Sequence, residues 1–357
     1  MSQFHALKVA SVTPETDDAV SIVFEVPTAL KDTFRFTQGQ HLVVRATLNG
    51  AEVRRTYSIC ASPDDSALRI AVKRFPGGVF SNFANDQLKP GDAIDVMPPV
   101  GHFFTALDPS QAKTYVAFAI DEGITPILSL VKTTLAREPK SRFVLFYGNE
   151  TVNSILFREE IEDLKNLYLA RLSLFHILSC EEQEVDILNG RLDGEKARAL
   201  AQAFCPAEVI DEVFICCPQD VTNDIISALG DLGVAKNHLH FELFHTAALA
   251  EKAPLPAKKE TRENAAHVTL TLNGRKTEFD MPLDGTSVLA AARDRDIDAP
   301  FSCRDGVCGT CRAKLIEGKV DMAVNYALEE EDLAAGFVLT CQARPLTDKI
   351  VIDYDQA

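Results

Sequence analysis

The chain lacks several features that would place it on a membrane or on nucleic acid. None of its apolar runs is long enough to cross a bilayer, and its N-terminus has no secretory signal pattern. Positive charge is scarce, with 36 Lys and Arg against 52 Asp and Glu and a net charge of −16. Such an acidic chain repels the phosphates of nucleic acid. We therefore expect a cytoplasmic protein that binds neither membrane nor nucleic acid.

The histidines show no spacing typical of a metal site, but the cysteines do. Nine cysteines in a reducing compartment fit metal ligation and buried thiols better than disulfides. The spacing C-x4-C-x2-C with a distant fourth Cys is that of plant-type ferredoxins, in which four thiolates hold a [2Fe–2S] cluster. Zinc is a distant alternative. Gly306 and Gly309 permit the tight turns that point backbone amides at sulfur. The predicted ligands are Cys303, Cys308, Cys311 and Cys341.

Composition divides the chain into parts. The first hundred residues are rich in short strands with turn residues between them, which is typical of a closed antiparallel barrel. From Lys113 apolar strands alternate with helices, which indicates a parallel α/β sheet. A charged stretch with two prolines follows and favours a linker. Beyond it, a hairpin at Asn273–Gly274 and a short helix precede the cysteines. The predicted domains are 1–106, 107–249 and 265–357, with a linker at 250–264.

Two motifs in the barrel half offer contacts for a phosphate and a ring system. Arg55–Ser58 supplies a guanidinium, an aromatic face and a hydroxyl. Alone, this motif fits an ordinary strand with one core tyrosine. Gly77–Ser81 predicts a glycine loop that opens a helix, where backbone N–H groups receive phosphate. Together they resemble the flavin-binding pattern of the ferredoxin–NADP reductase superfamily.

This resemblance implies roles for individual residues. Arg55 and the glycine loop would hold the FAD pyrophosphate, Tyr57 would stack on the isoalloxazine, and Ser58 would hydrogen-bond near its N5. Pro99–Phe103 resembles the segment that closes the FAD site. Catalytic positions beside the nicotinamide would be Ser58, Cys216 and Glu242. The implied cofactor-binding residues are Arg55, Thr56, Tyr57, Ser58, Gly78, Val79, Phe80, Ser81, Gly123, Thr125 and Pro126.

Longer stretches narrow the resemblance. Residues 4–10, 54–60, 189–196 and 325–343 closely resemble the reductase subunits of bacterial phenylacetyl-CoA 1,2-epoxidases, and the likeness covers essentially the whole chain. It implies an FAD-binding antiparallel β-barrel, a parallel α/β NAD(P)H domain and a β-grasp ferredoxin domain. It also implies an NAD(P)H-dependent oxidoreductase whose electrons pass through FAD and the [2Fe–2S] cluster to a di-iron oxygenase of phenylacetate catabolism. The alternative partners are another oxygenase or a hybrid-cluster protein.

The predicted nucleotide site departs from the family pattern. Thr125 is expected to cap a helix that begins at Pro126. The turn before it carries Asp121 and Glu122 instead of small residues. A like-charge pair at about 4 Å costs roughly 1 kcal/mol in water and about 4 at a typical surface dielectric. Cys217 likewise adds a side chain where relatives bring backbone close to the cofactor.

Three interpretations of these departures remain open. If Asp121 and Glu122 point away from the nucleotide, hydride transfer survives. Glu150 would favour NADH, because a carboxylate accepts from a ribose 2′-hydroxyl and repels a 2′-phosphate. Alternatively, the nucleotide site is impaired and the chain is a flavin and iron–sulfur electron carrier that cannot take hydride itself.

Overall fold

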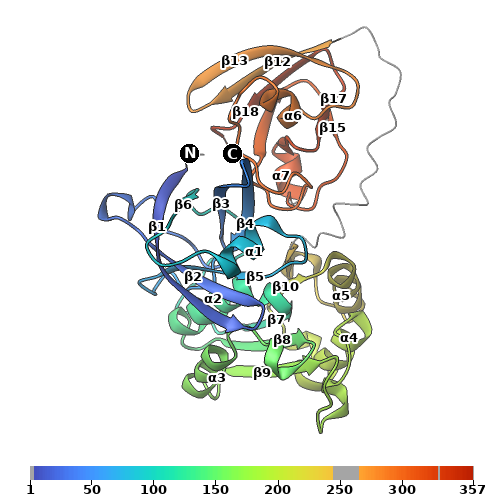
Figure 1. The fold of residues 1–357 in the computed structure, drawn as a ribbon. Helices are drawn as coiled ribbons and strands as arrows, with labels where there is room; N and C mark the ends of the chain where they lie inside the picture. The colour runs from blue at the N-terminus through green and yellow to red at the C-terminus, as the bar shows by residue number, and fades with distance from the viewer. Residues whose placement is uncertain (1–3, 244–264, 329, 357) are drawn as a thin grey trace. The chain divides into compact units, whose positions relative to one another are not determined.

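The computed structural model describes residues 4–243, 265–328 and 330–356, which form two compact units (Figure 1). The larger unit holds residues 4–243 and the smaller one the residues from 265 onward. The predicted linker at 250–264 lies outside the described residues. No described helix is long and apolar enough to pass through a membrane.

The first part of the larger unit is a six-stranded antiparallel sheet in the order β4-β3-β6-β1-β2-β5. The sheet closes because Ile59, directly after β4, bridges Ile70 in β5. Leu7, Ile22 and Leu42 are fully buried inside it. The predicted antiparallel barrel is confirmed. Its elements are β1 (His5–Thr16), β2 (Ala19–Glu25), β3 (His41–Leu48), β4 (Ala51–Ser58), β5 (Leu68–Lys73), α1 (Val79–Asp86) and β6 (Ala93–Val96).

The second part is a five-stranded parallel sheet in the order β11-β10-β7-β8-β9. Helices α2 and α3 cover one face and α4 and α5 the other (Figure 1). The strand order reverses beside β7, so the carboxyl ends of β7 and β10 flank the crevice where such sheets bind ligands. The elements are β7 (Thr114–Ile120), α2 (Ile124–Arg137), β8 (Arg142–Asn149), α3 (Arg158–Leu167), β9 (Leu172–Leu178), α4 (Gly194–Phe204), β10 (Glu212–Cys217), α5 (Gln219–Asp231) and β11 (Leu239–Leu243).

The prediction for the start of α2 is wrong by two residues. A 3₁₀ turn over Asp121–Gly123 leads directly into the helix, which begins at Ile124. Thr125 therefore lies inside the first turn, and its hydroxyl donates to the Glu122 carbonyl at 2.9 Å instead of capping the helix. Pro126 is tolerated there because first-turn N–H groups have no partner within the helix.

Buried hydrogen bonds join the barrel to α2. The Ser129 hydroxyl donates to the Ala61 carbonyl at 2.6 Å, and the Thr133 hydroxyl donates to Ser62 Oγ at 3.0 Å. Lys132 pairs with Asp65 at 2.6 Å at the edge of the same contact. The segment after β4 is thus fixed against the nucleotide half, which sets the position of Ser58 relative to β10 and β11.

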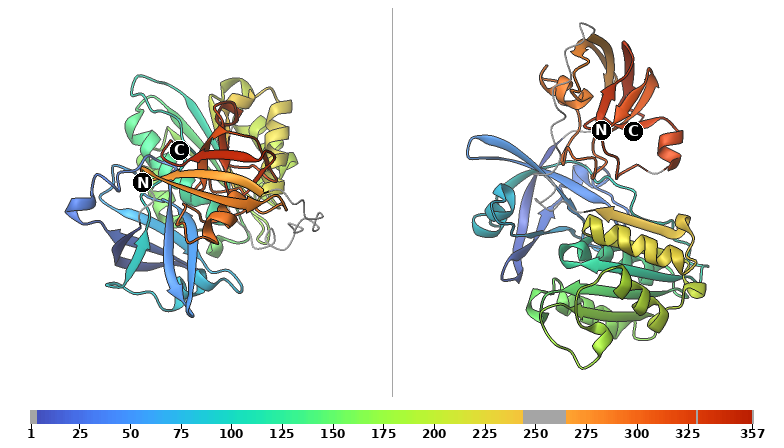
Figure 2. Two further views of the ribbon diagram at one scale, coloured as in Figure 1. Left: turned by 90° about the horizontal axis from the view of Figure 1, so that it is seen from above. Right: turned by 90° about the vertical axis from the view of Figure 1, so that its right-hand side faces the viewer.

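The smaller unit is a five-stranded mixed sheet in the order β13-β12-β18-β14-β16, with α6 packed against its apolar core (Figure 2). Asn273 and Gly274 both have positive φ, as a two-residue hairpin turn requires, so the predicted hairpin is confirmed. Ser287 caps α6 by accepting from the Ala290 amide. The elements are β12 (Ala265–Leu272), β13 (Arg275–Pro282), α6 (Val288–Arg293), β14 (Arg312–Glu317), β15 (Val320–Met322), α7 (Glu330–Ala334), β16 (Phe337–Leu339), β17 (Ala343–Pro345) and β18 (Lys349–Asp353).

Candidate redox site

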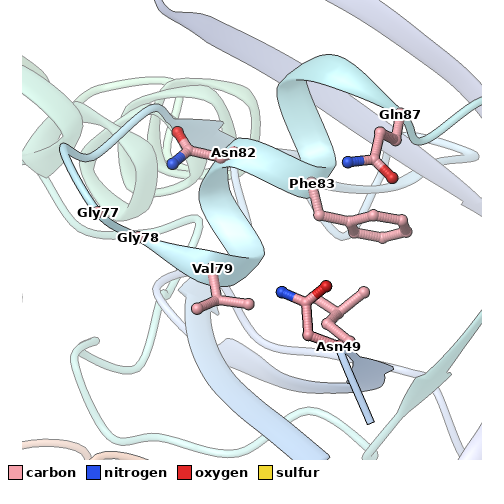
Figure 3. A pocket seen from close by; sticks show the side chains of 8 residues that line it. Asn49, Gly77, Gly78, Val79, Asn82, Phe83 and Gln87 are labelled. Carbon is pink, nitrogen blue, oxygen red and sulfur yellow. The ribbon is translucent and has the colours of Figure 1, made fainter. Parts of the chain in front are cut away.

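A pocket of about 300 Å³ lies at the start of α1, where the sequence predicts a phosphate-binding loop (Figure 3). Gly77 has φ +75°, and a Cβ on Gly78 would lie 2.3 Å from Ser81 Oγ, so the loop needs both glycines. No side chain caps the helix, so its first N–H groups remain available to a ligand. Val79 is 40% exposed in the pocket wall. A glycine cradle with open amides fits the diphosphate of FAD.

The side chains of the other predicted flavin-binding residues differ in their exposure and contacts. Arg55 is exposed on β4, and its guanidinium donates to the Arg54 carbonyl at 2.8 Å. Thr56 precedes Tyr57 on the same strand and pairs with Val43 of β3. The Tyr57 ring lies 5.7 Å from that of Phe80. Burial raises the pKa of Tyr57, which keeps its phenol neutral.

Two residues of the glycine loop are turned inward. Phe80 is only 1% exposed and belongs to the barrel core, so only its backbone can reach a ligand. The Ser81 hydroxyl accepts from the Phe75 amide at 3.1 Å and donates to the Gly78 carbonyl at 3.4 Å. This side chain therefore holds the loop closed on itself. Whether either residue contacts FAD stays a prediction.

The three predicted catalytic residues come together where the barrel meets the parallel sheet. The Ser58 hydroxyl, at the end of β4, donates to Glu242 Oε2 at 3.0 Å. Glu242 on β11 pairs in register with Cys216 on β10. Burial first, and then Glu242 and other nearby acidic groups, raise the pKa of Cys216 well above its usual range. Cys216 is thus a neutral thiol beside a hydrogen-bonded carboxylate.

His41 joins this group although no sequence motif pointed to it. It stands directly opposite Ser58 in the β3–β4 pairing, and its Nδ1 lies 3.5 Å from Glu242 Oε1. The side chain is 4% exposed. A Cβ on Gly101 would lie 3.0 Å from His41 Nδ1, so the segment that closes the site needs glycine there. Only the strand register, which the sequence leaves open, places His41 behind Ser58 and Glu242.

At the nucleotide edge of the sheet, the amide of Ile124, the first residue of α2, donates to the carbonyls of Asp121 and Glu122. Gly123 is buried immediately before the helix, and no side chain caps it. Cys217 is fully buried in the core under α4 and α5, on the opposite face from Cys216. Its side chain therefore does not occupy the space beside Cys216. The N-terminus of α2 at the switch point fits the diphosphate of a dinucleotide.

The Asp121 carboxylate forms an ion pair with Lys73 of β5. This pair partly neutralises the first of the two carboxylates in the turn that differs from the family pattern. Glu150 is exposed just beyond β8, where the sequence predicts it near the ribose. That role stays a prediction.

In the smaller unit, the four predicted cluster ligands lie in one loop system. Cys303 Sγ accepts from the backbone amides of Asp305 and Cys308, each at 3.4 Å. Gly306 and Gly309 have φ +76° and +66°, as the predicted tight turns require. A Cβ on Gly306 would lie 3.0 Å from the Val324 carbonyl. Backbone donors aimed at sulfur fit an iron–sulfur cluster.

The thiols lie in two hydrogen-bonded pairs, Cys303 with Cys308 and Cys311 with Cys341. In each pair the partner and burial raise the pKa of one thiol, that of Cys303 or Cys311. Among the described residues, no group of three or more His, Cys, Asp or Glu side chains is set around a single metal ion. The C-x4-C-x2-C spacing with a distant fourth Cys is what favours a [2Fe–2S] cluster over a single zinc ion.

The arrangement suits a two-electron donor and a one-electron acceptor. Bound FAD accepts hydride and releases electrons singly. The protein's part is positional: Glu242 accepts the single hydroxyl proton of Ser58, so Ser58 would present its oxygen as an acceptor beside the flavin, and Cys216 would offer a neutral surface. The second oxygen of Glu242 faces His41, which orients the carboxylate. The carboxylate in turn fixes the direction of the Ser58 hydroxyl.

Three family comparisons cover the three parts of the chain. Residues 6–105 match the oxidoreductase FAD-binding domain, residues 122–225 the oxidoreductase NAD-binding domain, and residues 270–346 the 2Fe-2S iron-sulfur cluster binding domain. The predicted cofactors FAD, NAD(P)H and [2Fe–2S] are confirmed at the level of these families.

Individual relatives match along the whole chain. One component of the 1,2-phenylacetyl-CoA epoxidase of Escherichia coli (strain K12) is 42% identical over 99% of both chains. The ferredoxin reductase component of 3-ketosteroid-9-alpha-monooxygenase of Rhodococcus rhodochrous is 33% identical over 98% of this chain and 96% of its own. The solved phthalate dioxygenase reductase, described as a modular structure for electron transfer from pyridine nucleotides to [2Fe-2S], covers 98% of both chains with 25% identity and a TM-score of 0.56. The chain therefore belongs to the family of FAD- and [2Fe–2S]-dependent oxidoreductases that includes this component of phenylacetyl-CoA epoxidase.

Proposed function

We propose that this chain is the NAD(P)H-dependent reductase of a di-iron oxygenase, and that the oxygenase epoxidises phenylacetyl-CoA in phenylacetate catabolism. Hydride enters at the site of Ser58, Cys216 and Glu242, and single electrons leave through the cluster held by Cys303, Cys308, Cys311 and Cys341. The observation that carries the proposal is the convergence of Ser58, Glu242 and Cys216 within a chain that also matches all three cofactor-binding families. The 42% identity to an epoxidase component over the full length supports this oxygenase as the partner.

We propose a domain division close to the matched ranges, with FAD held by the barrel over 1–106 and NAD(P)H by 107–249. The ferredoxin domain would span 265–357, beyond a linker at 250–264. All nine cysteines are free thiols in the structure, which supports a reducing, cytoplasmic location.

The decisive experiment has two stages. First, the protein with its flavin and cluster is mixed anaerobically with NADH or NADPH, and flavin bleaching and cluster reduction are followed by absorbance. Second, the reduced protein is mixed with purified oxygenase components and phenylacetyl-CoA in buffer that contains O₂, and the epoxide product is measured. We expect flavin bleaching, then cluster reduction, then product.

The possible failures have different meanings. Absence of bleaching with either nucleotide would favour an electron carrier that another donor reduces. Bleaching without electron delivery to the epoxidase, but with delivery to a ketosteroid monooxygenase or a hybrid-cluster protein, would keep the reductase activity and replace the partner.

A further inference from the structure

Two of the predicted cluster ligands lie in a pair of tight turns in the smaller unit. Residues 309–312 form the first turn and residues 339–342 the second, and Cys311 and Cys341 are their third residues. Each turn is closed by a hydrogen bond of 2.9 Å from the amide of its fourth residue to the carbonyl of its first. Both thiols are buried and are hydrogen-bonded to each other. Their positions therefore depend on how the first turn is held against the second.

Thr340, the residue before Cys341, joins the two turns. Its amide donates to the Cys311 carbonyl at 3.1 Å, and its hydroxyl donates to the same oxygen at 3.0 Å. A carbonyl oxygen has two lone pairs, and both are used here. Thr340 is fully buried, and its own carbonyl accepts from the Leu289 amide of α6 at 3.0 Å. One residue of the second turn thus fixes the backbone of the cluster ligand in the first.

A tyrosine from the segment after β18 sets the direction of the Thr340 hydroxyl. The Tyr354 hydroxyl donates to Thr340 Oγ1 at 2.7 Å. A threonine hydroxyl rotates to suit its partners, so this bond leaves the Thr340 proton directed at the Cys311 carbonyl. Hydrogen bonds in such a chain also strengthen one another. Tyr354 is buried, and its amide donates to the Thr271 carbonyl of β12 at 3.0 Å, which fixes the tyrosine to the sheet.

The other two predicted ligands are held in another way. Cys303 and Cys308 are only partly buried. The hydrogen bonds at Cys303 Sγ come from backbone amides of its own loop. The chain of hydroxyls from Tyr354 through Thr340 therefore serves the buried half of the cluster site, where the two turns meet.

We propose that Tyr354, acting through Thr340, is a positioning residue for the iron that Cys311 and Cys341 would hold. This inference rests on the proposed function, since it concerns the cluster named there. Tyr354 acts on the metal site through the backbone of Cys311, so loss of its hydroxyl loosens one side of the cluster and leaves the sheet in place. The loss of one hydrogen bond corresponds to roughly a two- to tenfold change in a rate or an equilibrium constant.

The test removes single hydroxyls from the full-length protein with flavin and cluster in place. Tyr354→Phe keeps the ring and its packing and deletes only the hydroxyl. Iron release to an excess of chelator is followed anaerobically by the loss of the cluster's visible absorbance. Visible circular dichroism reports the arrangement of the thiolates around the intact cluster. Electron paramagnetic resonance after reduction with dithionite reports how uniform that arrangement is.

We expect three changes in Tyr354→Phe. Iron release should be roughly two- to tenfold faster than in the parent protein. The visible circular dichroism should lose amplitude, and the paramagnetic resonance signal should broaden. Both spectral changes follow because the Cys311 thiolate is then held in several orientations instead of one.

Tyr326→Phe is the matched control, because it is the same chemical change in the same unit. The Tyr326 amide donates to the Gly306 carbonyl at 3.0 Å, so this tyrosine also lies beside the cluster loop. Its hydroxyl is not the one that donates to Thr340. This variant should match the parent in iron release and in both spectra. Thr340→Val should be affected at least as strongly as Tyr354→Phe, whereas Thr340→Ser, which keeps the hydroxyl, should stay near the parent.

Parent-like iron release and spectra in Tyr354→Phe would overturn the proposal, and so would equal changes in Tyr326→Phe. A Tyr354→Phe protein that is less stable to heat but gives the parent's cluster spectra would also reject it, because the tyrosine would then contribute packing alone. If Tyr354→Phe assembles no cluster, Thr340→Ser and Thr340→Val decide, and equal behaviour of these two rejects the proposal. A parent protein without the absorbance of a [2Fe–2S] cluster would reject the cluster site itself, and this proposal with it, even if NAD(P)H still bleaches the flavin.

Discussion

Ser58 is the central residue of the candidate redox site. Its hydroxyl donates to Glu242 at 3.0 Å across the contact between barrel and parallel sheet. Its place beside the flavin is implied by the family pattern, but the Glu242 contact and the position of His41 behind it come from the tertiary structure. The sequence motif identifies Ser58, whereas the residues that contact it depend on strand register.

Removal of this hydroxyl should slow flavin reduction. We expect Ser58→Ala to lower the rate of flavin bleaching by NAD(P)H on the order of 10²-fold, because Glu242 loses the hydroxyl that holds it and the reacting groups are then less well placed. FAD content should be unchanged. Anaerobic stopped-flow absorbance measures the rate, and Ser58→Thr should recover most of it. An Ala variant with the parent rate would exclude a role for the hydroxyl.

Glu122 should also link folding stability to pH. Its pKa is about 7 in the folded chain against an ordinary value of 4.5, so the folded state holds this proton more tightly than the unfolded state. The resulting stability is complete below about pH 4.5 and is lost as pH rises through about 7. A difference of this size corresponds to about 3 kcal/mol.

Glu122→Gln should therefore raise the free energy of unfolding more at pH 8 than at pH 5. We expect a gain of about 2–3 kcal/mol at pH 8, since the amide carries no charge to bury. Urea unfolding followed by far-ultraviolet circular dichroism measures it. Glu159→Gln, on an exposed helix turn, should change stability little at either pH. Equal shifts at both pH values would contradict the assignment.

Among the elements, helix α2 connects the barrel with the parallel sheet. It begins at the nucleotide edge, and its side chains Ser129 and Thr133 reach the barrel segment that follows Ser58. The sequence predicts a helix after the nucleotide turn, and in the structure this helix ends at Arg137. Its start is mispredicted, because the left-handed Asp121 turn depends on contacts with Lys73 and Tyr147 from other elements.

The hydrogen bond from Ser129 should measurably hold the two halves together. Ser129→Ala leaves the buried Ala61 carbonyl unpaired, and we expect a loss of about 1–3 kcal/mol in the free energy of unfolding. Thermal or urea unfolding measures it. Ser227→Ala provides the control, because Ser227 lies nearer the surface in α5 and carries the same helix-propensity change. Equal effects of the two substitutions would show that the interface bond contributes nothing.

At the scale of the whole molecule, the chain combines a hydride acceptor and a one-electron carrier. The two activities are separable because the flavin residues and the cluster ligands belong to different compact units. We therefore expect the loss of one cofactor to leave the other in place.

Cys308→Ser should separate the two activities. We expect loss of the cluster's visible absorbance and of electron delivery to the oxygenase, while NAD(P)H still bleaches the flavin at the parent rate. Iron analysis, anaerobic spectra and a coupled epoxidation assay measure these effects. Cys180→Ser, at an exposed thiol outside the cluster loop, should behave as the parent. Retained electron delivery in Cys308→Ser would contradict the ligand assignment.

The sequence by itself determined the cofactors and the architecture, because thiolate spacing, glycine loops and strand periodicity are local properties of the chain. The cysteine loop, the glycine loop before α1 and the alternation that builds the parallel sheet can all be recognised from neighbouring residues. Tertiary structure alone decided what stands around the carboxylates. Asp121 pairs with Lys73, Glu242 contacts Ser58 and His41, and Glu122 forms no ion pair within the described part of the chain. Each of these outcomes depends on side chains that only folding brings into contact.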